Sequence, residues 1–261
     1  MRKVIAVFWL ALLLCLGGGA SYAYLPLMGA GKGGPTGGGG GGTWSKKQTG
    51  ATMGDSANSA TLAVTFGSAI TSGDAVTCIG AMDNAGTPTI STATDDKSNT
   101  YNQQAIIRDT TNGQAAFAIS LGNITNGPIT ITVTLGTGQS ARSMVCDEWN
   151  WSGGATAADP RDVPTGQVQA SPGTGTDGVT SGDTTTTVNG DLLVGLTMGY
   201  TATVSSGTGF TPATSIVSGT LYASLYSEYM VQTTAGGSTH ATFTQNANDV
   251  HVTWIIPLKH P

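Results

Sequence analysis

The chain has 261 residues, of which only 10% are charged, and it is rich in glycine, with 39 copies. Fifteen acidic residues against ten basic residues give a formal net charge of −5. An acidic chain with few lysines lacks the positive surface that attracts nucleic-acid phosphates, so we expect no nucleic-acid partner.

The N-terminus has the pattern of a secretory signal peptide. Residues 1–3 are a short basic start, residues 4–16 are apolar, and residues 21–23 (SYA) provide the small-x-small cleavage pattern. We predict a signal peptide over residues 1–23 and a mature protein that is secreted, either extracellular or periplasmic. The apolar run is shorter than the roughly 20 residues that a membrane helix needs, so we expect no membrane span after cleavage.

Cleavage would remove two basic residues and leave eight against fifteen acidic ones, so the mature chain is more acidic than the precursor. Residues 24–43 follow the signal peptide and contain Pro26, Pro35 and an unbroken glycine run from 37 to 42. This composition predicts a flexible Gly/Pro-rich tether rather than a packed segment.

From Trp44 onward, short apolar or alternating runs are separated by Gly, Asn, Asp and Pro, which is typical of strands and turns. No longer segment has a helical period, so we predict an all-β protein. In chain order, the predicted strands cover residues 60–66, 74–82, 115–122, 129–135, 142–149, 179–187, 192–199, 221–231, 238–244 and 250–258.

The run from 129 to 135 alternates strictly between apolar residues and threonine. Ile129, Ile131, Val133 and Leu135 therefore share one face of the predicted strand, with the threonines on the other. One buried and one exposed face is typical of an antiparallel sandwich.

The body of the chain contains an internal repeat. The motif GDAVT at residues 73–77 returns as GDLLV at 190–194, and the strands that follow each copy recur in the same order. We predict an antiparallel β-sandwich domain over residues 44–261, jelly-roll or immunoglobulin-like, built from two duplicated halves of about five strands each (about 52–153 and 174–258). One sandwich completed by both halves is favoured over two domains in series, because each half offers few large apolar residues.

The mature chain contains two cysteines, Cys78 and Cys146, both in the first half. Export makes a disulfide possible, and the two strands that carry them belong to the same half and could meet across the sandwich. The disulfide is therefore a candidate, with two buried free thiols as the alternative.

We assign no catalytic residue. A glycan hydrolase would need two carboxyl groups across a cleft, and Glu148 and Glu228 are the only glutamates, each on a strand of a different half. A secreted glycan hydrolase that uses this pair is the enzymatic alternative.

Three oxygen-bearing side chains, Asp95, Asp96 and Asn99, lie within five residues in the long connection of the first half. Calcium binds six to eight oxygens from such loops, so a calcium site is one interpretation. The alternative is a turn that uses Asp and Asn for its own backbone hydrogen bonds. No other cofactor is expected.

Aromatic pairs are the remaining candidates for binding. Trp149 and Trp151 are two residues apart and share a face if the strand continues, and Tyr222 and Tyr226 share a face of another strand. Exposed rings of this kind could stack on sugars, whereas buried rings would pack the core.

The order of the motifs supports a resemblance that covers nearly everything after the tether. It resembles a β-sandwich domain that recurs in secreted bacterial and phage-related proteins. The resemblance implies architecture and export, and it assigns neither an activity nor functional residues. It is based on the motifs GD at 73–74, NTY at 99–101, ITITVTL at 129–135, DEWNWSG at 147–153, DPRDV at 159–163 and NGDLLVG at 189–195.

The sequence therefore favours a secreted, non-catalytic β-sandwich module for adhesion, carbohydrate contact or surface structure. Its expected partner is a carbohydrate or a cell-surface protein. A structural component of a phage virion or surface appendage is a further alternative, and the oligomeric state stays open.

Overall fold

The computed structural model describes residues 41–55, 58–83, 86–104, 106–162, 169–172, 178–199, 203–217, 224–247 and 249–261. The described part contains strands, turns and bends but no helix, which confirms the predicted all-β class. Residues 39–261 form one compact unit. The predicted signal peptide lies outside the described residues, as does the tether up to residue 40.

The first half supplies two sheets, whose strands pair antiparallel. The first central sheet has the order β1-β10-β4-β8-β6, with the short strands β2 and β7 paired to β10 and β8, and the first outer sheet has the order β3-β9-β5. The bounds are β1 Trp44–Thr49, β2 Met53–Asp55, β3 Ser59–Thr65, β4 Ala75–Asp83, β5 Ile90–Asp95, β6 Asn102–Gln103, β7 Ile107–Asp109, β8 Gln114–Leu121, β9 Thr130–Gln139 and β10 Arg142–Trp151.

The second half supplies the second central sheet, with the order β11-β20-β14-β17-β16, and the second outer sheet, with the order β12-β19-β15. Strands β13 and β18 form a separate pair. The bounds are β11 Gln169–Pro172, β12 Gly178–Thr180, β13 Thr184–Thr185, β14 Asp191–Gly199, β15 Val204–Ser206, β16 Thr211–Ile216, β17 Ser224–Gln232, β18 Ser238–Thr239, β19 Thr242–Gln245 and β20 Val250–Leu258.

The two halves arrange their strands in the same order. In the first central sheet β4 lies between β10 and β8, and in the second β14 lies between β20 and β17. In each outer sheet the middle strand, β9 or β19, is the one that comes last in the sequence. This correspondence follows the order in which the sequence repeat presents its strands.

The repeated Gly-Asp motif has a structural reason in both halves. Gly73 and Gly190 have φ values of +91° and +88°, which a residue with a side chain rarely adopts. Each glycine turns the chain into the middle strand of a central sheet, and the aspartate that follows it, Asp74 or Asp191, is buried.

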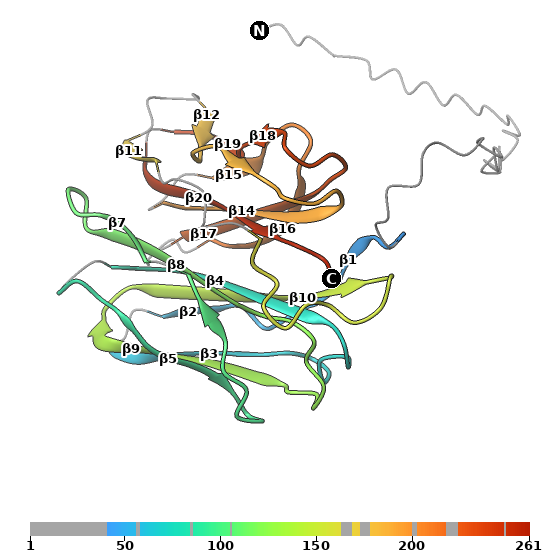
Figure 1. Ribbon diagram of the computed structural model, residues 1–261. Helices are drawn as coiled ribbons and strands as arrows, with labels where there is room; N and C mark the ends of the chain where they lie inside the picture. Colours follow the sequence, from blue (N-terminus) through green and yellow to red (C-terminus); the bar gives the residue numbers. More distant parts are fainter. Residues whose placement is uncertain are drawn as a thin grey trace, which may run out of the picture. The chain divides into compact units, whose positions relative to one another are not determined.

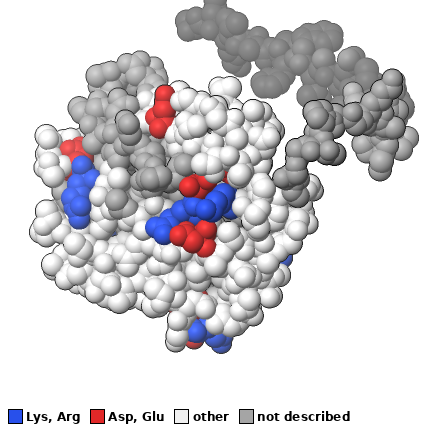
Figure 2. Space-filling view, viewed as in Figure 1, with Lys and Arg blue, Asp and Glu red and all other residues white. Residues whose placement is uncertain are grey.

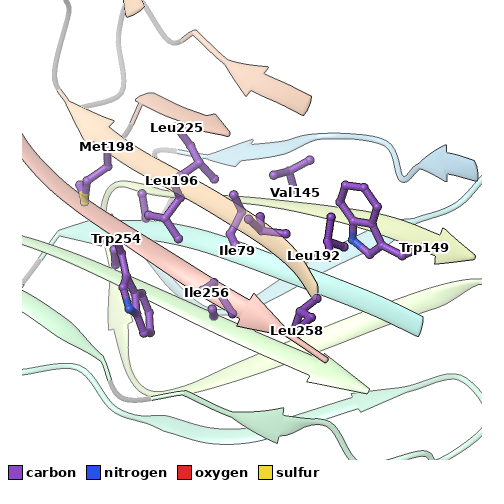
Figure 3. Packing of buried hydrophobic residues seen from close by; sticks show 14 of the residues in the cluster. Ile79, Val145, Trp149, Leu192, Leu196, Met198, Leu225, Trp254, Ile256 and Leu258 are labelled. Atoms are coloured by element: carbon purple, nitrogen blue, oxygen red, sulfur yellow. The ribbon is translucent and has the colours of Figure 1, made fainter. Parts of the chain in front are cut away.

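The sheets stack in four layers, with a core between each pair of neighbours (Figure 1). One core lies between the central and outer sheets of the first half, and another between those of the second half. The third core joins the two central sheets and takes residues from both halves (Figure 3). The structure therefore differs from the expected single sandwich of two sheets. Each half has its own central and outer sheet, and the two halves share the apolar core between their central sheets.

The shared core is dense in large side chains. Leu192, Leu196 and Trp254 of the second half and Trp149 of the first are fully buried in it. Burial of one such aliphatic side chain contributes about 1.5–3 kcal/mol. The shared core therefore supplies much of the hydrophobic stabilisation that holds the two halves in one unit.

The predicted strands agree with the structure wherever the sequence is apolar. The five first-half predictions correspond to β3, β4, β8, β9 and β10, while 179–187 divides into β12 and β13 and 238–244 into β18 and β19. Residues 192–199, 221–231 and 250–258 correspond to β14, β17 and β20, and 221–223 lie outside the described residues. Ile131, Val133 and Leu135 are buried as predicted, but Ile129 precedes the strand and is 39% exposed.

The surface reflects the low charge of the sequence. On the face shown in Figure 2, charged residues of both signs gather in a few small patches and most of the surface is uncharged. Within the described ranges, no helix has the length and apolar character needed to cross a membrane.

Candidate functional site

The structure buries the tryptophans that the sequence offered for sugar stacking. Trp149 is 0% exposed and its ring packs edge-on against Tyr229, with the ring centroids 5.0 Å apart. Its indole N–H donates a hydrogen bond to Thr77 Oγ1. Trp151 is 4% exposed and stacks on His260, with the centroids 4.3 Å apart. The predicted shared face is correct, but the second central sheet covers it, so neither ring can stack on a sugar at the surface.

The two glutamates lie in different layers. Glu148 shares a face of β10 with Cys146, on the side of the first outer sheet, and accepts a hydrogen bond from the backbone N–H of Thr71. Glu228 accepts hydrogen bonds from the backbone N–H groups of Gly207 and Thr242, on the side of the second outer sheet. The shared core separates them, so the pair does not form the two-carboxyl site of a glycan hydrolase.

The expected calcium loop is held by its own hydrogen bonds. Asp95 Oδ1 accepts the backbone N–H groups of Lys97 and Asn99, and its Oδ2 accepts the Asn99 amide at 2.8 Å. Asp96 Oδ1 accepts the backbone N–H of Ile129 at 2.9 Å. These oxygens face hydrogen-bond donors, which is the turn geometry of Asp and Asn rather than a set of cation ligands.

Within the described ranges no group of three or more His, Cys, Asp or Glu side chains is placed to hold a metal ion. In the loop of Asp95, Asp96 and Asn99, the carboxylates accept hydrogen bonds within the turn and from Ile129.

Cys78 and Cys146 form a disulfide between β4 and β10. The two residues are direct cross-strand partners, with their Cα atoms 4.0 Å apart. The structure thus has the bridge rather than two free thiols, but it joins neighbouring strands of one sheet and does not cross the sandwich as expected.

One of the aromatic candidates borders a pocket. The pocket has a volume of about 330 Å³ and lies where β15, an edge strand of the second outer sheet, approaches β16, an edge strand of the second central sheet. Tyr226 and Phe243 border the pocket but are largely buried in the core behind it, whereas Tyr222 lies outside the described residues. The lining residues are Val204, Ser205, Ser206, Pro212, Ala213, Thr214, Ser215, Tyr226, Ser227 and Phe243.

A β-bulge shapes one wall of this pocket. The register of β16 against β17 shifts between Pro212 and Ser215. The Ser227 hydroxyl takes the place of the missing ladder bonds, because it accepts the Thr214 N–H at 3.0 Å and donates to the Thr214 carbonyl at 2.8 Å. The bulge disrupts the β16–β17 ladder locally, at the point where Thr214 and Ser227 line the pocket.

The same wall is anchored to the first half. Lys46 Nζ donates to the carbonyl of Ala213 at 2.8 Å, and the Thr214 hydroxyl donates to Asp147 Oδ1 at 3.3 Å. Burial raises the pKa of Asp147, although Lys46 and Thr49 partly oppose this effect. The position of β16 therefore depends on the packing of the two halves.

Comparisons with known protein families, with curated proteins and with solved structures found no match. The functional assignment must therefore come from the site itself. Sequence reasoning missed most of the lining, because serine and threonine are spread throughout the chain. Tyr226 is the lining residue that the sequence analysis selected, because it shares a predicted strand face with another tyrosine.

Two buried carboxyls have pKa values near neutrality. Burial raises the pKa of Glu228 from its ordinary 4.5 to about 7, against the opposing effect of its two backbone hydrogen bonds. Burial, together with the neighbouring carboxyl of Asp162, raises the pKa of Asp191 to about 7. The folded protein therefore holds these protons more tightly than the unfolded chain does.

These shifts predict that stability decreases as the pH rises from about 4 to about 7, because folding stabilises the protonated form of both groups. We expect the unfolding temperature to fall over this range, and the fall to be smaller in Glu228→Gln. Calorimetric scans at a series of pH values measure both. The Asp96→Asn control should keep the full fall, because hydrogen bonds from the Ile129 and Thr130 N–H groups lower the Asp96 pKa. An unfolding temperature that rises through this range would contradict the prediction.

Proposed function

We propose that this protein is a secreted, non-catalytic β-sandwich module whose pocket between β15 and β16 binds a small carbohydrate unit at a cell surface. The observation that carries the proposal is the composition of the pocket. Tyr226 and Phe243 border it with only 5% and 1% of their surface exposed, and the hydroxyl-bearing side chains of Ser206 and Ser215 line it. A small neutral ligand that is rich in hydroxyls matches this mixture of hydroxyl-bearing and apolar side chains.

The volume of the pocket supports a small ligand. Ligand pockets usually fall between about 300 and 1,000 Å³, and this one is near the lower limit. It has room for a small ligand rather than a long glycan. Apart from the phenol of Tyr226, the lining has no titratable group, so it supplies no acid-base pair for hydrolysis.

Export is supported by two independent observations. The first is the signal-peptide pattern of residues 1–23. The second is the Cys78–Cys146 disulfide, since such bonds persist mainly in oxidising compartments.

A glycan-array screen of the exported protein tests the proposal. We expect binding to a defined group of glycans, and Ser215→Tyr should weaken it at least about tenfold, which corresponds to ~1.4 kcal/mol. Ser215 is exposed and lines the pocket, so a larger side chain there occupies the ligand's space with little effect on the core.

Thr211→Tyr is the matched control. Thr211 is exposed on the same strand but does not line the pocket, so this variant should bind like the unmodified protein. An array without any bound glycan would reject the proposal. Equal binding by both variants would reject the pocket as the site.

A further inference from the structure

Lys47 occupies an irregular position on the first strand. The register of β1 against β10 shifts between Lys46 and Gln48, which leaves Lys47 as the extra residue of a β-bulge. After the bulge, Gln48 pairs with Glu148, and its amide donates to Glu148 Oε2 at 2.5 Å. The bulge thus brings Lys47 beside the face of the central sheet on which Glu148 lies.

The amine of Lys47 reaches a buried carboxyl there. Its Nζ lies 3.2 Å from Asp74 Oδ2 and donates to Thr71 Oγ1 at 2.9 Å. Asp74 is 2% exposed, and its other oxygen accepts the Asn150 amide at 2.8 Å. The Lys47 side chain is 38% exposed, so its ammonium group can exchange protons with water.

A second carboxyl completes the group. Thr71, whose hydroxyl accepts from Lys47, donates its backbone N–H to Glu148 Oε1 at 2.8 Å. Burial raises the pKa of Asp74. Burial also acts to raise the pKa of Glu148, but hydrogen bonds, the largest from the Thr71 N–H, outweigh it and lower that pKa. Of the two carboxyls, Asp74 therefore binds a proton more readily and Glu148 less readily than usual.

This arrangement places an amine in contact with a buried carboxyl, and a second carboxyl is bonded to the same threonine as the amine. We propose that Lys47 and Asp74 join in an intramolecular isopeptide bond, with Glu148 as the group that transfers the proton. The inference does not depend on the ligand of the pocket.

The reaction balances without an oxidant or a cofactor. After the ammonium loses one proton to water, Lys47 Nζ attacks Cγ of the neutral Asp74 acid. Glu148 takes a proton from the attacking nitrogen and gives it to the departing hydroxyl of Asp74. An N–C bond forms, a C–O bond breaks and one water molecule leaves. The folded chain supplies the proximity that makes such a condensation fast compared with the same reaction between separate molecules.

The bond would change how the protein carries force. In the first central sheet β10 lies between β1 and β4, and Asp74 immediately precedes β4. The cross-link would join the first strand covalently to the middle strand of the sheet. The tether precedes β1 in the sequence, so a pull on it would load this bond instead of the hydrogen bonds between β1 and β10.

Peptide mass spectrometry of the exported full-length product tests the proposal. Trypsin normally cuts after Lys47, and an amide on Nζ blocks this cut. We expect the reduced and alkylated protein to yield one uncut peptide over residues 47–97 whose mass is lower than the sequence mass by one water. Cleavage after Lys47 with unchanged masses, both in fresh protein and after prolonged incubation, would overturn the proposal.

Two variants separate the bond from other ways to lose water. Lys47→Arg keeps the positive charge but cannot form the amide, so it should show no loss, and a loss that persists there would identify a cyclised aspartate instead. Glu148→Gln should form the bond about 100-fold more slowly, since proton transfer by a positioned group contributes at least this factor. An unchanged rate in a folded Glu148→Gln protein would overturn the role of Glu148.

Discussion

Replacement of Trp149 by alanine is expected to lower the free energy of unfolding by about 3–5 kcal/mol, the usual range for a buried large aromatic side chain. The side chain is completely buried in the core that joins the two central sheets. The substitution removes the edge-on contact with Tyr229 and leaves Thr77 Oγ1 without the indole donor. Denaturant titration followed by circular dichroism measures the change.

Val217→Ala serves as the control for this experiment. Val217 is 62% exposed, and surface substitutions of this kind usually change stability by no more than about 0.5 kcal/mol. A loss of less than about 1 kcal/mol in Trp149→Ala would contradict the burial of the ring in the shared core. The stability measurement is also needed to interpret binding data, because Trp149→Ala would reduce glycan binding through unfolding alone.

The sequence predicted the strands that carry the cores and missed most of those at the edges. Strands β4, β14 and β20 are apolar on both faces because each central sheet is covered on both sides, and this gave a strong signal. By contrast, β1 (WSKKQT) and β16 (TPATSI) are polar edge strands whose pairing comes from the neighbouring strand. The composition of a polar segment therefore does not predict whether it pairs with a neighbouring strand.

The tryptophans show a second limit. Their spacing correctly placed Trp149 and Trp151 on one face of β10, since alternate residues of a strand share a face. Whether that face meets water depended on the packing of the second central sheet against the first. A repeat in the sequence indicates that two similar halves exist, but not which of their surfaces meet.

Glu228 shows how one half departs from the other. It pairs across the strands with Gly195, whereas Ile119 pairs with Cys78 at the equivalent place in the first half. A Cβ on Gly195 would lie 2.9 Å from Glu228 Cγ, so glycine is needed for this close approach. The sequence alone presented Glu228 as a strand carboxylate. Only the structure shows that it replaces an apolar residue inside a core, which is the cause of its raised pKa.

Removal of the disulfide is the second change with a large expected effect. The double variant Cys78→Ala/Cys146→Ala should lose about 4 kcal/mol of stability, because the bridge closes a loop across a sequence separation of 68 residues and restricts the unfolded chain. Both sulfurs are also fully buried in the core between the central and outer sheets of the first half. Denaturant titration of the variant beside the oxidised protein measures the loss.

Reductant provides the matched control for the disulfide. It should destabilise the unmodified protein and leave the double variant unchanged, since the variant has no bond to reduce. The pairing of Cys78 with Cys146 within the β4–β10 ladder does not remove the effect, because those ladder hydrogen bonds are lost on unfolding and the disulfide persists. Equal stability of the oxidised protein and the double variant would mean that the bridge does not restrict the unfolded chain.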